Sequence, residues 1–100
     1  MLGLLEVLLQ MTKPYKDIEI TDSYIIREFD ENIDSIELKW HRDLKSRTVT
    51  VLEGQGWKFQ KENELPLELN KGDVIFIQAK EWHRIFIGET NLRLKIEEYN

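Results

Sequence analysis

The sequence contains no cysteine. Without thiols the chain cannot form disulfide bonds, zinc ribbons or iron–sulfur clusters, and it cannot use a thiol as a nucleophile. Histidine is also scarce, with two residues in a chain of 100, and proline occurs only twice. Any site that depends on an imidazole must therefore use one or both of these two histidines.

Positive charge is in deficit, because 14 lysine and arginine residues stand against 19 acidic residues and the formal net charge is −5. Surfaces that bind nucleic acid usually carry a cluster of basic residues. The sequence has no such cluster, so we expect no nucleic-acid partner. No apolar run approaches the roughly 20 residues that a membrane-spanning helix needs. We therefore expect no membrane association and a cytoplasmic location.

The first ten residues are apolar, but they lack the basic start and the small-residue cleavage site of a signal sequence, and Glu6 interrupts them. We predict that residues 1–16 form an N-terminal segment that docks on the body of the protein or on a dimer partner. Residues 17–100 then form a single domain, because a chain of this length suffices for one hydrophobic core.

Apolar and polar residues alternate through most of the chain after residue 17, which is the pattern of β-strands with one buried face. Turn signals separate the strands, as at Gly54-Gln55-Gly56. Pro66 has no N–H to donate, so its strand is expected at a sheet edge. Many short strands at roughly 8–12-residue spacing are typical of an all-β sandwich or barrel. The predicted strands cover residues 18–20, 24–29, 36–41, 48–52, 57–60, 65–69, 74–77, 82–87 and 92–96.

Both histidines lie in the same tripeptide, Trp-His-Arg, which occurs at residues 40–42 and again at residues 82–84. His41 and Asp43 are two residues apart on a predicted strand, so their side chains point to the same face. If the barrel brings His83 beside them, two imidazoles and one carboxylate form the facial triad of non-haem Fe(II) sites. The same donors also suit Mn, Ni or a catalytic Zn with a bound water.

From about Ile33 to Glu98 the sequence resembles a small single-domain cupin. The positions of the first cupin motif, which the family fills with Gly, His, His, Glu and Gly, are here filled by Ser35, His41, Asp43, Arg47 and Gly54. In the second motif Gly72 and His83 match the family's glycine and histidine, while Gln78 replaces proline, Lys80 replaces glycine and Ile87 replaces asparagine. The resemblance implies an all-β jelly-roll barrel, the cupin double-stranded β-helix.

The resemblance is less specific for activity, because the cupin superfamily includes oxygenases, isomerases, sugar binders and inert storage proteins. One departure concerns the site directly: Arg47 stands where the family has a glutamate ligand. A guanidinium stays charged and has no lone pair to give to a metal. Arg47 either pairs with Asp43 in a metal-free polar cluster at the barrel mouth, or binds a substrate carboxylate or phosphate beside the metal. In the second case we place Lys39 beside Arg47 in anion binding.

Trp40 and Trp82 alternate with the two histidines, so we expect them on the opposite face of their strands. An apolar patch there needs a cover, which either the leucine-rich N-terminal segment or a second subunit can supply. Small cupins are commonly dimers, so we predict a homodimer. The alternative is that both rings fill the core of the sandwich.

Three functions remain open at this stage. The first is a metal-binding protein or metal-dependent enzyme, with Fe, Mn, Ni or Zn on His41, Asp43 and His83, that acts on a small anionic molecule. The second is a metal-free module that binds or senses a small ligand in the same pocket. The third is a structural domain with a degenerate site. No residue set identifies a substrate.

Overall fold

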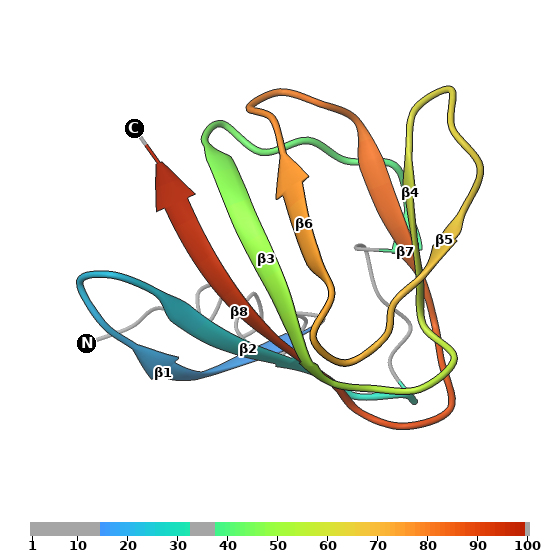
Figure 1. Ribbon diagram of the computed structural model, residues 1–100, viewed down its shortest axis with the longest axis horizontal. Helices are drawn as coiled ribbons and strands as arrows, with labels where there is room; N and C mark the ends of the chain where they lie inside the picture. Colours follow the sequence, from blue (N-terminus) through green and yellow to red (C-terminus); the bar gives the residue numbers. More distant parts are fainter. Residues whose placement is uncertain (1–14, 33–37, 100) are drawn as a thin grey trace, which may run out of the picture.

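The computed structural model describes residues 15–32 and 38–99, and within them it contains eight β-strands and no α-helix (Figure 1). The strands are β1 (Tyr15–Ile20), β2 (Ile25–Phe29), β3 (Ser46–Glu53), β4 (Lys58–Lys61), β5 (Leu67–Glu68), β6 (Val74–Ile77), β7 (His83–Phe86) and β8 (Leu92–Tyr99). The all-β prediction is thus confirmed. The docking predicted for the N-terminal segment falls almost wholly outside the described residues, although β1 begins at Tyr15, two residues before the predicted boundary.

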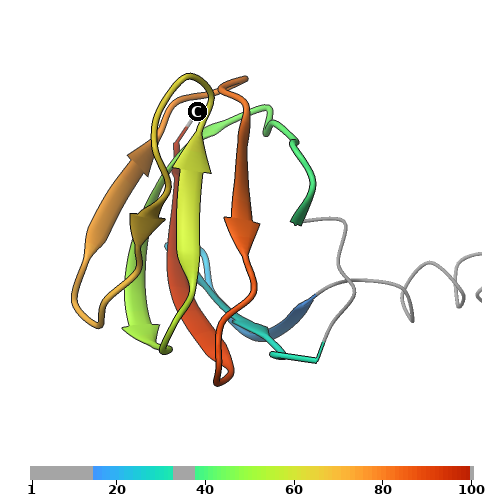
Figure 2. The same ribbon diagram turned by 90° about the vertical axis from the view of Figure 1, so that its right-hand side faces the viewer.

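The strands form two antiparallel sheets that face each other (Figure 2). The larger sheet has the order β1-β2-β8-β3-β6, and the smaller has the order β5-β4-β7. The chain crosses between the sheets at each of the connections β3–β4, β5–β6, β6–β7 and β7–β8. This alternation is the connectivity of a jelly roll, in which two sheets of antiparallel strands enclose one core.

The core lies between the two sheets and is built from the inward-facing residues of both. The buried apolar side chains are Phe29, Val49, Val51, Trp57, Phe59, Leu69, Ile77, Ile85, Leu92, Leu94 and Ile96. The strict alternation of β3 and β8 places every second side chain in this layer, as the period of a strand requires. Trp57 and Phe59 belong to this layer, with exposed fractions of 1% and 4%.

The turn predicted at residues 54–56 connects β3 and β4, and a second glycine turn precedes β6. Gly56 and Gly72 have φ values of 79° and 91°, in the left-handed region that glycine enters at little cost. β5, which follows Pro66 directly, is an edge strand of the smaller sheet, as the missing N–H of proline predicts. No helix in the described residues is both long and apolar enough to cross a membrane.

One predicted strand is not formed where the structure describes it. Residues 38–40 are not in a strand, and His41 makes only an isolated bridge to His83; residues 36 and 37 lie outside the described part of the chain. Alternation alone does not create a strand, because a strand also needs a neighbour along its length. Ile87 likewise lies beyond the end of β7 and is 42% exposed, so the strand predicted over residues 82–87 ends one residue earlier than expected.

Candidate metal centre

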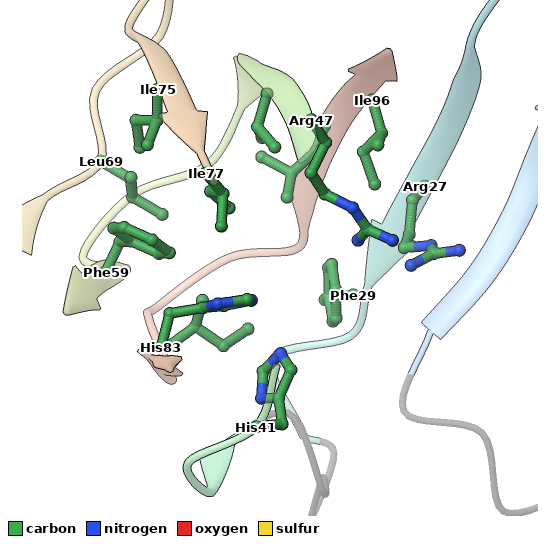
Figure 3. Close-up of a pocket in the computed structure, with 13 residues that line it drawn as sticks. Arg27, Phe29, His41, Arg47, Phe59, Leu69, Ile75, Ile77, His83 and Ile96 are labelled. Atoms are coloured by element: carbon green, nitrogen blue, oxygen red, sulfur yellow. The ribbon is translucent and has the colours of Figure 1, made fainter. Parts of the chain in front are cut away.

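The structure brings His41, Asp43 and His83 together at one end of the barrel interior. His83 begins β7, His41 pairs with it from the segment that crosses the barrel end, and Asp43 follows two residues later. Each residue offers one ligand atom, and these three atoms lie within 4.8 Å of one another. Figure 3 shows the two imidazoles facing each other beside the cavity. Side chains from two segments far apart in the sequence, residues 41–43 and β7, therefore form one cluster.

Backbone carbonyls fix the orientation of both imidazoles in the same way. Nδ1 of His41 lies 2.9 Å from the carbonyl oxygen of Lys39, and Nδ1 of His83 lies 2.8 Å from that of Glu81. A carbonyl oxygen only accepts hydrogen bonds, so each Nδ1 carries the proton. A neutral ring then has its lone pair on Nε2, which is the arrangement that metal-binding histidines use.

The charge of Asp43 is maintained despite partial burial. Burial raises the pKa of this carboxyl, but a hydrogen bond from the His83 ring, made when its Nε2 carries a proton, and the positive charge of Arg47 outweigh the effect of burial, so the pKa lies below the ordinary value of 3.8. Asp43 is consequently a carboxylate at neutral pH. A divalent ion would meet an ionised oxygen donor without having to displace a proton.

The donor atoms of this cluster are placed to coordinate a cation rather than to hydrogen-bond to one another. Oδ2 of Asp43 is buried and accepts no hydrogen bond from the described residues. Nε2 of His83, the ring's lone-pair atom, lies only 3.2 Å from this oxygen. Two lone-pair atoms at this distance require a proton or a metal ion between them. Bonds near 2.1 Å at right angles would place two ligand atoms about 3 Å apart, so a shared metal ion matches the observed spacing.

Arg47 reaches the cluster from β3, where the cupin resemblance places it. Its Nη1 atom lies 3.4 Å from Oδ2 of Asp43, and Nη2 lies 3.8 Å from Oε2 of Glu98. The ion pair of the metal-free interpretation is therefore present. Nε of Arg47 is buried and has no hydrogen-bond acceptor among the described residues. The Arg47 guanidinium thus neutralises part of the negative charge of Asp43, and its Nε–H remains available to donate to another group.

Lys39 occupies a different position from Arg47. Its side chain is exposed, and it is not among the residues that line the cavity beside the cluster. Its main-chain carbonyl accepts the Nδ1 proton of His41. The structure thus gives Lys39 a backbone role in orienting His41, while anion binding by its side chain stays a prediction.

A cavity of about 50 Å³ adjoins the cluster and is open to solvent on one side. A volume of this size holds a few water molecules or a ligand of a few non-hydrogen atoms. Its polar lining groups are the two histidines, Arg47 and Arg27, and the rest of the lining is aliphatic or aromatic (Figure 3). No carboxylate is among the described residues that line it. The cavity therefore combines apolar walls with positively charged groups.

Sequence reasoning did not identify Arg27 as part of this lining. Arg27 lies on β2, two residues before the buried Phe29, and so faces inward. Its Nε and Nη2 atoms donate to the two carboxylate oxygens of Asp17 at 2.7 and 3.2 Å, and the guanidinium lies 3.6 Å from the centre of the Tyr15 ring. The signal that was available is an arginine at an inward position of a predicted strand.

Lys80 replaces a glycine of the cupin motif and keeps the backbone conformation that glycine would favour. It stands at a glycine position of the family, and its φ is 65°, which is unusual for a residue with a side chain. Its backbone N–H donates to the carbonyl oxygen of Asp43 at 2.7 Å. The turn that glycine would favour is thus retained with lysine in its place, and it holds the main chain of a candidate ligand.

Trp40 and Trp82 lie on the outside of the barrel, on the side away from the histidines. Their exposed fractions are 40% and 39%, and together with Glu62 and Asn63 they line a shallow surface groove. The placement on the opposite face from the histidines is confirmed. The alternative in which both rings fill the core is wrong.

Comparison with known proteins extends these observations. No family model matches the sequence, and no curated protein matches it. Solved structures do match. A cupin-2 domain protein from Shewanella frigidimarina superposes with a TM-score of 0.61 at 14% identity, covering 98% of this chain and 94% of its own. FeII HppE superposes with a TM-score of 0.59 at 17% identity, covering 85% of this chain and 48% of its own.

A third match is a chain from the crystal structures of the DMSP lyases RdDddP and RnDddQII, with a TM-score of 0.64 and 20% identity. The match covers 80% of this chain but only 40% of the lyase chain. This chain therefore corresponds to less than half the length of two of these neighbours. Similarity at these identities establishes the fold, and the chain has the fold of small cupin domains, as the sequence motifs predicted.

Proposed function

We propose that this protein binds one divalent metal ion through His41, Asp43 and His83 and acts on a small organic anion in the adjoining cavity. The observation that carries the proposal is the close approach of Nε2 of His83 and Oδ2 of Asp43, at 3.2 Å, while no residue in 15–32 or 38–99 donates a hydrogen bond to that oxygen. Buried polar atoms almost always have a partner. A metal ion would supply a partner for this oxygen.

The residues of the site would have two roles, metal binding and anion binding. His41, Asp43 and His83 would hold the metal, and the facial arrangement leaves coordination positions for water, oxygen or substrate. A bound divalent metal would supply a Lewis acid or an activated water. Arg47 and the apolar walls would bind and orient the anion, because a charge-assisted hydrogen bond to a guanidinium is strong where water is excluded. Fe, Mn, Ni and Zn are all compatible with this donor set.

The proteins of similar fold support this direction without fixing the reaction. One of them is described as an iron(II) form, and another is a lyase. Cupin-like barrels thus include proteins that hold a metal and proteins that act on small molecules. The substrate and the reaction type of this chain are not determined by the fold, because one fold hosts many activities.

Metal analysis of the protein purified without chelators tests the proposal. We expect about one equivalent of Fe, Mn, Ni or Zn for a single site of three ligands. His41→Ala and His83→Ala should each retain less than about a tenth of it, because each removes a direct ligand. Asp22→Ala, which removes an exposed acid between β1 and β2, is the control and should keep the wild-type content.

Two results would contradict the ligand assignment or the metal itself. If both histidine variants keep the metal, the ion is bound elsewhere. If the wild-type protein takes up none of the four metals after reloading, the metal-free alternative replaces the proposal. The contact of Arg47 with Asp43 favours that alternative: the barrel would then be a binding or sensing module in which Arg47 holds the anion.

We also propose a homodimer formed through the outer face that carries Trp40 and Trp82, and a cytoplasmic location. Two indoles at about 40% exposure on one face give apolar area for an isologous contact. Light scattering should give a mass of about 24 kDa, twice the 12.0 kDa of the chain. The double variant Trp40→Glu, Trp82→Glu should be a folded monomer, and a well-folded dimer of that variant would reject this interface.

A further inference from the structure

The two copies of the Trp-His-Arg tripeptide pair with each other in the structure, and this pairing involves residues outside the proposed metal site. The two copies run antiparallel and are centred on the pair His41–His83, whose backbones exchange two hydrogen bonds of 3.0 and 2.9 Å. In an antiparallel pair, the residue before one centre lies opposite the residue after the other. The tryptophan of each copy therefore lies opposite the arginine of the other copy.

Both of these cross-strand pairs are in contact. The guanidinium carbon of Arg84 lies 4.5 Å from the centre of the Trp40 ring, and that of Arg42 lies 5.0 Å from the centre of the Trp82 ring. These distances are within the range of cation–π attraction. Because neighbouring side chains point to opposite sides, the pairs lie outside the barrel, directly behind the two imidazoles. We call these two pairs the clasp.

The two halves of the clasp are not equivalent. Arg84 is half-buried, its Nε donates to Oε1 of Gln60 on β4 at 2.9 Å, and its guanidinium carbon also lies 4.7 Å from the centre of the Phe86 ring. Arg42 is exposed. Arg84 is thus held by the smaller sheet and in turn holds Trp40, which is the residue next to His41.

This attachment matters because the segment that carries His41 and Asp43 is not part of a sheet. Its described residues, 38–45, contain the isolated bridge at His41 and no strand. Its backbone contacts with the β6–β7 region are the His41–His83 pair and the hydrogen bond from Lys80 to the carbonyl of Asp43. The Arg84–Trp40 contact adds a side-chain attachment beside the bridge, and so restrains where the His41 ring points.

We propose that the clasp positions the two metal-binding imidazoles, and that Arg84 is its main positioning residue. The proposal rests on the proposed function, in that the geometry it protects is that of the metal ligands. Partners outside the coordination sphere that orient metal ligands typically change metal affinity 10–100-fold when they are removed. The clasp would act on the ligand-bearing backbones from the side opposite the metal.

Cobalt(II) binding by a set of arginine variants tests this role, with affinity and the visible absorption spectrum as the two readouts. Arg84→Met keeps the length of the side chain and removes its charge, and we expect about a tenfold loss of Co²⁺ affinity with a changed spectrum. Arg84→Lys retains a cation over the ring and should recover most of the affinity. Arg93→Met is the matched control, because it removes a cation that pairs with Glu28 on the outer face of the larger sheet. It should bind Co²⁺ as the wild type does.

Two results would overturn the positioning role. One is an Arg84→Met variant with wild-type affinity and spectrum, and the other is an Arg84→Lys variant that binds no better than Arg84→Met. If Arg84→Met does not fold, Trp40→Leu removes the other member of the pair at a position that is 40% exposed. It should then show the same loss, and wild-type binding by this variant would equally reject the proposal.

Failure of metal binding and failure of the clasp are distinguishable in the metal-free protein. The centres of the His41 and His83 rings are 4.3 Å apart with an interplanar angle of 67°, so ring protons of the two histidines should give a nuclear Overhauser effect. We expect this signal in the wild type and in Arg93→Met, and its loss in Arg84→Met. If the wild type binds no Co²⁺, this comparison still decides the clasp. A signal that persists in Arg84→Met rejects it.

Discussion

Replacing Asp43 with asparagine is expected to lower the affinity for a divalent metal by at least about a hundredfold, because even the loss of a partner outside the coordination sphere costs 10–100-fold. Asparagine has nearly the same shape as aspartate but carries no charge. Asp43 is the one acidic member of the three-residue cluster, so the substitution removes the only ligand that neutralises a divalent ion. Calorimetric titration with Mn²⁺ and Zn²⁺ measures the change directly.

The same substitution has a defined effect on stability in the metal-free protein. The pKa of Asp43 is lowered below 3.8 in the folded state, so its charged form stabilises the fold at pH values above that of the unfolded carboxyl. This contribution is lost as the pH falls through the folded pKa. The part of the stability difference between wild type and Asp43→Asn that comes from this carboxyl should be present above about pH 5 and should shrink below about pH 4.

The control for Asp43→Asn is Asp73→Asn, which changes an acid whose Oδ2 accepts a hydrogen bond from the backbone N–H of Asn70 in the turn before β6. It should leave metal affinity unchanged. An Asp43→Asn variant that binds metal as tightly as the wild type would show that Asp43 is not a ligand. A stability difference that grows on acidification would contradict the direction assigned to its pKa.

Replacing Gly88 with alanine is expected to destabilise the fold by about 3 kcal/mol, near the upper end of the usual cost of overpacking a core. A Cβ atom at this position would overlap the ring of Trp57 and the carbonyl oxygen of Gln55, and would lie 2.6 Å from the backbone nitrogen of Trp57. Trp57 cannot move aside easily, because it is 1% exposed and its Nε1 donates to the carbonyl oxygen of Thr90 at 2.6 Å.

Gly72→Ala is the comparison variant, because it introduces backbone strain without steric overlap. A Cβ at Gly72 would meet nothing within 4 Å, although its φ of 91° is unfavourable for alanine. The expected cost of left-handed strain is about 1–2 kcal/mol, less than that of Gly88→Ala. Urea unfolding of both variants gives the comparison. A Gly88→Ala variant within about 1 kcal/mol of wild type would show that Trp57 is less rigidly held than its contacts indicate.

Much of the fold could be predicted from the sequence because its signals are local. The period of two in residues 48–52 and 92–96 and the turn residues between strands depend on near neighbours only. The edge position of the strand after Pro66 also follows from one residue's missing N–H. The strand predicted over residues 36–41 shows the limit of this reasoning. Whether alternating residues form a strand depends on a partner strand elsewhere in the chain.

The candidate site was predictable in its members but not in its arrangement. The spacing of His41 and Asp43 indicated a shared face, and the cupin resemblance placed His83 near them. That the two histidines are direct cross-strand partners depends on register, which no local pattern contains. The inward direction of Arg27 and its ion pair with Asp17 on β1 depend on strand pairing in the same way.

A crystal structure of the protein grown with Zn²⁺, with an anomalous difference map at the zinc edge, tests the central claim most directly. We expect one strong peak bonded to Nε2 of His41, Nε2 of His83 and an oxygen of Asp43, at about 2.0–2.2 Å from each. Either a map without a peak among these three residues or a zinc ion bound wholly by other side chains would contradict the metal centre described above.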